Sequence, residues 1–330
     1  MEENKILVSP KVAIVVPIYN PGVSALSRAL QSLCAQTLRE FEIICVLDCP
    51  KDGSDAFVYE LSKTNDRIIV IQNEINQGVS HSRNAGIARA VLDGAEFIGF
   101  MDHDDYVAPE MFEKLYHHAV SQKFDVVRCN TIIEFQDRIV KDYFNDTSWE
   151  GMVRSLLLPM HSSKNPNYLS RSVWNTIYKT EIVKQIRFKD RSIYYEEDTL
   201  YNLSVCAKTK NIGYIPEEFY HWVKTNDSLS QERVEHHLVC SRILNYFEYE
   251  WQLLKENQME RFAQELYINI SWFLRHYRII FPTMEGDYQK RLGHLLKDCK
   301  FPIFGRYEDL KIVSKARLKL FIMVIKLKKI

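Results

Sequence analysis

The amino-acid sequence predicts an α/β protein built on a doubly wound, mostly parallel sheet. Two observations lead to this prediction. Short apolar runs alternate with amphipathic helical patterns over the first third of the 330 residues, and each strand–helix unit has the length of a βαβ crossover. Ligands of such sheets bind beyond the carboxyl ends of the strands. The segments that directly follow the predicted strands are therefore the first candidates for a functional site.

The predicted strands are short apolar runs, rich in Val, Ile and Phe, that end at turn residues. In chain order they are residues 12–16, 41–47, 68–71, 97–101 and 125–131. The predicted helices repeat apolar residues every three or four positions, as Leu26, Leu30 and Leu33 do. In chain order they are residues 25–34, 56–62, 79–92, 109–120, 174–185 and 200–205. Pro109 suits the start of its helix, where a missing N–H is tolerated.

The sequence changes in character beyond the sheet. From about residue 231 to residue 299 the pattern is helical and rich in aromatic residues, and Pro302 and Gly305 then mark a linker. We expect four parts: an N-terminal tail (1–9), an α/β domain (10–225), a helical domain (226–305) and a basic amphipathic tail (306–330).

Composition argues against several classes of protein. The 43 Lys and Arg residues balance the 43 Asp and Glu residues, which is not typical of a nucleic-acid-binding protein. The N-terminus lacks the apolar core of a signal peptide, and no run approaches the ~20 apolar residues that span a bilayer. The seven cysteines are scattered without a CxxC pair, so we expect neither a zinc site nor disulfides and favour a reducing cytoplasm.

The last twenty residues depart from this charge balance. Residues 311–330 contain seven basic and no acidic side chains, together with the apolar run 320–325. Basic residues near anionic lipids contribute on the order of 1 kcal/mol each, and the stretch is too short to span a bilayer. We expect the tail to hold a cytoplasmic protein at the inner face of the cell membrane. The alternative is that the tail packs on the helical domain.

An acidic cluster follows the predicted strand 97–101 directly. Asp102, Asp104 and Asp105 place three carboxylates within four residues, and like charges this close repel each other unless a cation or donors neutralise them. Carboxylates suit a hard divalent ion such as Mg²⁺ or Mn²⁺, which can also bridge a diphosphate. The alternative is a solvated turn that caps the helix beginning near Pro109.

A second acidic group, Glu196-Glu197-Asp198, precedes the predicted helix 200–205. Acidic residues favour a helix N-terminus, so these side chains could simply cap that helix. The functional alternative is a general base that the fold brings near the metal site.

Four segments, in this order and spacing, resemble those of the family 2 glycosyltransferases: residues 15–20 (VVPIYN), 82–86 (SRNAG), 100–105 (FMDHDD) and 197–198 (ED). The resemblance covers about residues 10–230 and implies the GT-A fold for the α/β domain. It implies an inverting enzyme of the bacterial surface-glycan type. Such an enzyme transfers a hexosyl or N-acetylhexosaminyl group from a nucleotide-diphosphate sugar, with UDP as the expected nucleotide, to a hydroxyl of a glycan or lipid-linked acceptor.

The resemblance implies a metal and diphosphate site at the acidic cluster. Asp104 is the expected ligand of Mn²⁺ or Mg²⁺, and Asp102 is expected to face the ribose and the metal. His221 could complete the metal shell or could be a packed loop histidine. Lys224 could neutralise the diphosphate or could be a solvated loop lysine.

The resemblance also implies a nucleotide site. Tyr19 is expected to stack on the base, beside backbone contacts from Pro17. Asp48 falls on the acid that contacts the base. Here the sequence departs from the family pattern, because Leu47 replaces an acid and Cys49 replaces a small glycine. The shape of this loop is therefore not fixed by the resemblance.

Two further residues follow from the same motifs. Arg83 resembles an arginine that donates hydrogen bonds near the nucleotide, and Asp198 falls on the second acid of the Glu-Asp motif, the general base. A sugar hydroxyl has a pKa far above neutrality, so a carboxylate must take its proton as it attacks. One metal site and one base suffice for a single displacement, and the product is then inverted.

Two other functions compete with this interpretation. A nucleotidyltransferase also uses a parallel sheet and a carboxylate-bound metal, but residues 17–22 lack the Gly-rich, basic loop that such enzymes carry after the first strand. The chain could instead be a scaffold that binds nucleotide sugars without catalysis. The presence of Asp102, Asp104 and Asp198 argues against that, since a scaffold needs no base.

Overall fold

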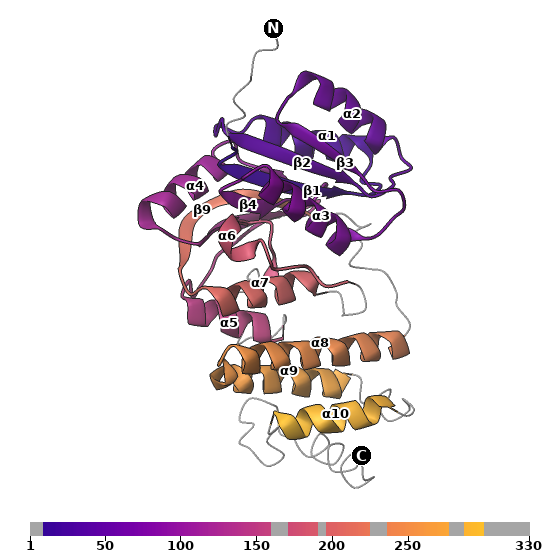
Figure 1. Ribbon diagram of the computed structural model, residues 1–330, viewed down its shortest axis with the longest axis vertical. Coiled ribbons are helices and arrows are strands. Elements are labelled where there is room, and N and C mark those ends of the chain that lie inside the picture. Colours follow the sequence, from indigo (N-terminus) through magenta and orange to yellow (C-terminus); the bar gives the residue numbers. More distant parts are fainter. Residues whose placement is uncertain (1–8, 160–170, 191–195, 225–235, 277–286, 300–330) are drawn as a thin grey trace.

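The computed structural model describes residues 9–159, 171–190, 196–224, 236–276 and 287–299. The part of the chain up to Val223 contains a nine-stranded sheet, seen in the upper half of Figure 1. Helices cover this sheet, and further helices form a layer below it.

The sheet has a parallel half and a mixed half. In spatial order its strands are β3 (Ile68–Gln72), β2 (Phe41–Leu47), β1 (Val12–Ile18), β4 (Phe97–Phe100), β8 (Thr176–Lys179), β6 (Val126–Glu134), β9 (Ile212–Val223) and β5 (Tyr106–Val107), with β7 (Ile139–Asp142) paired to β6. The first four strands are parallel, whereas β8 is antiparallel to both β4 and β6. The predicted doubly wound α/β sheet is confirmed.

Helices cover both faces of the sheet. One face carries α1 (Val23–Cys34), α2 (Ser54–Thr64) and α4 (Met111–Gln122), and the other carries α3 (Val79–Leu92), α6 (Thr180–Val183) and α7 (Glu197–Lys208). The central strand β1 is buried along its whole length, because Ile14 faces the first core and Val15 the second. A Cβ atom on Gly86 of α3 would lie 2.2 Å from Cγ1 of Val15, so glycine is what lets α3 approach the sheet this closely.

A second layer of helices, here called the helical layer, has its own apolar core (Figure 1). It contains α5 (Trp149–Leu157), α8 (His236–Glu256), the 3₁₀ helix η3 (Glu260–Phe262), α9 (Ala263–His276) and α10 (Asp287–Asp298). Helix α7 belongs to both cores. Leu200 and Leu203 pack with the helical layer, whereas Tyr201 and Val205 pack against the sheet. The placement of α7 therefore depends on both layers.

The predicted helix at residues 174–185 is wrong. Residues Thr176–Lys179 form strand β8, and only Thr180–Val183 are helical. Within β8, Ile177 and Tyr178 are fully buried in the cores on opposite faces of the sheet. A strand covered on both faces carries a continuous apolar run, and periodicity cannot distinguish such a run from a short buried helix.

The long strand β9 was also missed from the sequence. It contains Pro216, and its pairing with β6 shifts register around Asn130, whose Nδ2 donates to the Pro216 carbonyl oxygen at 2.7 Å. Bulges tolerate a proline that cannot donate to the ladder. Beyond the bulge β9 continues to Val223, which brings its last residues beside the acidic cluster.

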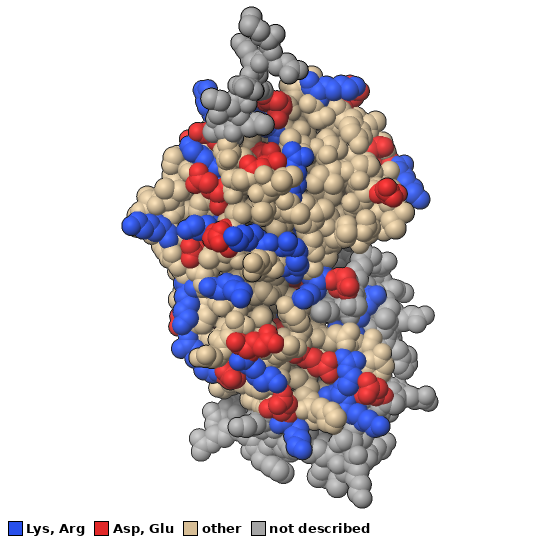
Figure 2. Space-filling model, in the orientation of Figure 1, with Lys and Arg blue, Asp and Glu red and all other residues tan. Residues whose placement is uncertain are grey.

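Several predictions fall outside the described residues. The tail 306–330, the linker at 302–305, the first eight residues and the segment 225–235 are among them, so the four-part division of the chain stays a prediction. No helix in the described part of the chain is long and apolar enough to cross a membrane. Acidic and basic side chains are interspersed over the face shown in Figure 2, in keeping with the zero net charge.

Candidate active site

The candidate site lies at the edge of the sheet where β1 and β4 end. These strands are parallel neighbours, with Val15 paired to Phe100, so Tyr19 and Asp102 leave the sheet at the same edge. Helix α3 begins at this edge too, because it follows the parallel strand β3 through a short loop. This is the edge at which doubly wound sheets bind ligands.

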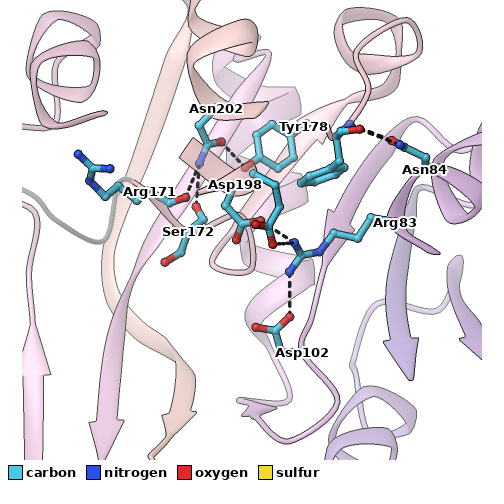
Figure 3. Close-up of polar contacts among 10 residues, drawn as sticks. Arg83, Asn84, Asp102, Arg171, Ser172, Tyr178, Asp198 and Asn202 are labelled. Atoms are coloured by element: carbon cyan, nitrogen blue, oxygen red, sulfur yellow. Dashed lines mark hydrogen bonds and ion pairs between the residues drawn. The ribbon is translucent and has the colours of Figure 1, made fainter. Parts of the chain in front are cut away.

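One buried guanidinium joins three acidic side chains at this edge (Figure 3). Nη1 of Arg83 lies 2.5 Å from Oδ1 of Asp198 and 3.4 Å from Oε1 of Glu197, and Nη2 lies 3.1 Å from Oδ1 of Asp102. Asp102 follows β4, whereas Glu197 and Asp198 begin α7. The two acidic groups predicted as separate parts of one site therefore meet on a single arginine. We call these four residues the Arg83 cluster.

Arg83 is held in place by packing as well as by charge. Its side chain is 4% exposed and lies over the ring of Phe188, 5.1 Å from the ring centre. Asn84 fixes Phe188 in turn: its side chain donates to the Phe188 carbonyl oxygen and accepts from the Phe188 amide, both at 2.9 Å. Desolvating a guanidinium is unfavourable unless it is well paired, and the three carboxylates supply that pairing.

The charges of the cluster shift its protonation equilibria. Burial disfavours the guanidinium cation, yet the charges of Asp198, Asp102 and Glu197 hold the pKa of Arg83 above its ordinary value. Burial raises the pKa of Asp198 to about 8. The charge of Arg83 lowers this pKa, whereas the charges of Glu197 and Asp102 raise it. The Val173 amide also favours the charged form of Asp198. Asp198 is therefore a carboxylate whose pKa is high enough for it to accept a proton near neutral pH.

The loop that carries the acidic cluster is anchored by its neighbours. Asp105 is 1% exposed and accepts hydrogen bonds from the Tyr220 hydroxyl at 2.6 Å and the Val223 amide at 2.9 Å, both on β9. Asp105 therefore fixes the loop and does not face a ligand. At the other end of the loop, Nδ1 of His103 contacts the Pro17 carbonyl oxygen at 2.9 Å.

Asp104 is the third carboxylate of this loop. Its backbone carbonyl oxygen accepts from Nη2 of Arg28 at 2.6 Å, and its own backbone amide favours the charged form of its carboxylate. Burial and the charge of Asp102 raise the pKa of Asp104, which means that the two carboxylates oppose each other's ionisation. A metal role for Asp102 and Asp104 stays a prediction.

Asp48 supports the loop that leads into α3. It is 2% exposed, and its carboxylate accepts hydrogen bonds at 2.8 Å from Nδ2 of Asn73 and from the amides of Gln77 and Gly78. These bonds hold the loop that leads into α3, and hence the start of the helix that carries Arg83. A direct contact between Asp48 and a nucleotide stays a prediction.

Cys49, the departure from the family pattern, adopts the left-handed backbone conformation that glycine prefers. Its φ is 57°, and its thiol donates to the carbonyl oxygens of Asn73 at 3.4 Å and Glu74 at 3.1 Å. Residues other than glycine rarely adopt this conformation. The substitution thus changes the residue type and keeps a loop shape that suits glycine.

Tyr19 lies just beyond β1, and its side chain is 36% exposed. The ring is accessible at the site edge, as the predicted stacking on a base requires. Pro17 lies within β1, and its carbonyl oxygen is already in contact with His103. Both assignments stay predictions.

The structure does not place His221 in a common metal cluster with Asp102 and Asp104. Nδ1 of His221 lies 2.8 Å from Oε1 of Glu134, and its ring stacks on Tyr106 with 4.2 Å between centres. In the part of the chain that the structure describes, no three His, Cys, Asp or Glu side chains are grouped so that they could hold a metal ion. The metal role of His221 stays a prediction without support from this geometry.

Lys224 lies within electrostatic reach of the acidic cluster. Its Nζ sits over the Trp222 ring, 3.4 Å from the ring centre. Burial lowers the pKa of Lys224, against the charges of Asp105 and Asp104, which raise it. The role of Lys224 towards a diphosphate stays a prediction.

Sequence reasoning missed two contacts that shape the site. Arg28, on α1, holds the backbone of Asp104, and the amide of Val173 acts on Asp198. Arg28 is an exposed helical arginine like any other in the sequence, and a backbone amide has no sequence signature. Tertiary structure brings them to the site, through the packing of α1 on the sheet and the position of Val173 just before the central strand β8.

Known proteins resemble this chain in sequence. Residues 13–187, more than half of the chain, match the model of Glycosyl transferase family 2. The uncharacterized glycosyltransferase EpsJ of Bacillus subtilis is 30% identical over 229 residues, which cover 67% of this chain and 63% of EpsJ. Glycosyltransferase GlyA of Streptococcus pneumoniae is 27% identical over 231 residues, which cover 68% of this chain and 32% of GlyA. The matched regions thus span less than two thirds of either relative.

A solved structure resembles the whole chain in fold. The structure of S. aureus TarS 1–349 in complex with UDP-GlcNAc superposes with a TM-score of 0.66 at 18% identity, covering 97% of this chain and 91% of TarS 1–349. The curled sheet with helices on both faces is the GT-A fold expected from the sequence. The family match and this fold lead to one conclusion: the chain belongs to glycosyltransferase family 2.

Proposed function

We propose that this protein is an inverting, metal-dependent glycosyltransferase that moves a sugar from a UDP-sugar to a hydroxyl of a glycan or lipid-linked acceptor. The observation that carries the proposal is the Arg83 cluster. It brings Asp102, beside the cation site, and Asp198, a carboxylate with a raised pKa, to the ligand-binding edge of the sheet. A scaffold that only binds nucleotide sugars would need no such basic carboxylate beside the acidic loop.

The residues at this edge fit a divalent cation. Mg²⁺ in phosphate sites is usually held by one or two carboxylates plus substrate phosphates, so a set of three protein ligands is not required. Asp104 would be the main ligand and Asp102 the second, since the mutual opposition of these carboxylates is what a cation relieves. When bound, Mn²⁺ or Mg²⁺ would stabilise negative charge on the leaving diphosphate. Lys224 would add a second positive charge near the same oxygens.

Asp198 is proposed as the general base. With its pKa raised by burial, it can accept a proton from the attacking hydroxyl near neutral pH. Arg83 keeps this carboxylate oriented, and it limits how far burial raises the pKa. One base and no enzyme nucleophile give a single displacement, so the sugar in the product has the inverted anomeric configuration.

The proposed donor is a UDP-sugar. TarS was solved with UDP-GlcNAc, which supports a UDP donor and makes N-acetylglucosamine the first sugar to test. Both a hexosyl and an N-acetylhexosaminyl group remain in the proposal. Release of UDP without pyrophosphate identifies glycosyl transfer, whereas release of pyrophosphate identifies a nucleotidyltransferase.

The basic tail is proposed to bind the anionic inner face of the cell membrane, which would make the protein peripheral and cytoplasmic. The support is the sequence of residues 311–330, with seven basic side chains around an apolar run. In liposome flotation with phosphatidylglycerol vesicles, the full chain should float and a chain ending at residue 310 should not. Equal flotation of both chains would show that the tail packs on the protein itself.

The metal site is tested with Asp104→Asn. This variant keeps the side-chain shape and removes the charge that holds the cation, so Mn²⁺ should no longer strengthen UDP binding in calorimetry. In the wild-type protein, UDP binding should depend on Mn²⁺. Asp137→Asn, which changes an exposed carboxylate on the turn before β7, is the matched control and should leave this dependence unchanged. Undiminished metal dependence in Asp104→Asn would remove the metal assignment.

The base is tested with Asp198→Asn, which preserves shape and removes basicity. Turnover of the UDP-sugar should fall by about 10²-fold or more while the affinity for UDP stays near that of the wild-type protein. Glu197→Gln changes the neighbouring member of the Arg83 cluster and should lower turnover less. Glu197 lies farther from Arg83 than Asp198 does, and its proposed role is only to help position the cluster. Near-normal turnover in Asp198→Asn beside an inactive Glu197→Gln would assign the base to Glu197 instead.

A further inference from the structure

A buried polar network connects the helical layer to the start of α7, within two residues of Asp198. At its centre, Nη1 of Arg171 forms an ion pair with Oε2 of Glu196. The same carboxylate oxygen accepts a hydrogen bond at 3.2 Å from the hydroxyl of Tyr246, which lies on α8. Glu196 is the residue immediately before α7, so α8 reaches the N-terminus of this helix through a single carboxylate.

Both terminal nitrogens of Arg171 bond within this network. Its side chain is 5% exposed, and Nη1 also lies 3.3 Å from the Thr199 hydroxyl on the first turn of α7. Nη2 donates to the Leu158 carbonyl oxygen at the end of α5. One guanidinium therefore ties α5, α7 and the residue before α7 together. A planar, forked cation is suited to such multiple contacts, and lysine could not reproduce them.

The same segment is tied to Asp198 from the other side. Nδ2 of Asn202, on α7, donates to the carbonyl oxygens of Arg171 at 3.4 Å and of Ser172 at 2.9 Å (Figure 3). The next amide along the chain, that of Val173, favours the charged form of Asp198. A shift of residues 171–173 would thus move both a donor to Asp198 and the helix turn that carries it.

A second acidic residue, Glu250 on α8, lies at the same contact as Glu196. Glu250 is completely buried one turn after Tyr246, and a hydrogen bond from the Tyr246 hydroxyl favours the charged form of its carboxylate. Its charge acts on Arg171, and burial raises its pKa well above the ordinary value. The surrounding core is apolar, so Leu or Phe at these positions would pack without such desolvation. Hydrogen bonds and ion pairs fix the distance and orientation between α8 and the start of α7, whereas an apolar contact would fix neither.

We propose that Tyr246 on α8, acting through Glu196 and Arg171, positions the general base Asp198, so that the helical layer sets the geometry of catalysis. This inference rests on the proposed role of Asp198. Tyr246, Arg171 and Glu196 are positioning residues, because none of them is bonded to Asp198 itself. Displacing a catalytic group by as little as ~1 Å can lower the rate about 10²-fold, so a small change at α8 is enough to be measured.

The variant that tests this is Tyr246→Phe, which removes one hydroxyl and keeps the ring in the core. We expect kcat for metal-dependent hydrolysis of UDP-GlcNAc to fall about tenfold or more, with KM for the donor and UDP affinity unchanged. The matched control is Tyr267→Phe. It also removes a hydroxyl hydrogen bond within the helical layer, from α9 to the carbonyl oxygen of Cys299, which follows α10. It should lower thermal stability and leave kcat unchanged.

A second readout does not depend on turnover. Amide hydrogen exchange at Val173 and in the first turn of α7 should speed up in Tyr246→Phe and not in Tyr267→Phe. Glu196→Gln, which retains an oxygen acceptor for Tyr246, should fall between wild type and Glu196→Ala in both kcat and exchange.

Two results distinguish a failure of the proposed function from a failure of the inference about Tyr246. A wild-type protein that turns over no UDP-sugar contradicts the proposed function, and the exchange data then decide the structural link on their own. If Tyr246→Phe and Tyr267→Phe behave alike in kcat and in exchange at these amides, the network only stabilises the fold, and the inference is overturned.

Discussion

The site depends on one constraint: a single buried guanidinium must balance three carboxylates that come from two distant parts of the chain. Arg83 can be buried only because Asp102, Glu197 and Asp198 pair with it, and those acids can lie side by side only because Arg83 lies between them. Much of the surrounding structure serves this arrangement. Asp48 and the loop after β3 set the start of α3, and Gly86 lets α3 lie close enough to the sheet to place Arg83 at its edge.

The two layers of the molecule meet at α7. Its apolar residues divide between the core of the sheet and the core of the helical layer, and its first turn carries the proposed base. A catalytic group on a helix clamped from both sides is held more rigidly than one on a loop. The acidic loop after β4 is anchored differently, by Asp105 to the end of β9. The acidic loop and the proposed base thus rest on separate supports that Arg83 connects.

The features that could be predicted from the sequence are those that depend on residues close together in the chain. The bounds of β2 and α3 agree with the predicted ones, because short apolar runs and helical spacing determine them. Asp102 was singled out because it directly follows a predicted strand, whereas Arg83 and the choice of Asp198 came from the family resemblance. Their meeting on one guanidinium is a consequence of tertiary packing. So are the burial of Asp48 beneath a loop and the pairing of His221 with Glu134. Strand β8 was misassigned because burial on both faces removes the alternation that identifies a strand.

The dependence on Arg83 is tested most directly by measuring the free energy of unfolding of Arg83→Met against pH. Removing one partner of a buried ion pair costs about 3–5 kcal/mol, because it leaves uncompensated buried charge. Without Arg83 the folded-state pKa of Asp198, which burial already holds above its unfolded value, rises further. The variant should therefore lose stability as the pH rises through the raised pKa of Asp198, and its deficit relative to wild type should be largest near pH 8 and shrink towards pH 5. Arg67→Met removes an arginine that bonds to a carbonyl oxygen and an amide side chain, so its deficit should be the same at both pH values. A deficit for Arg83→Met that is equally independent of pH would contradict the account.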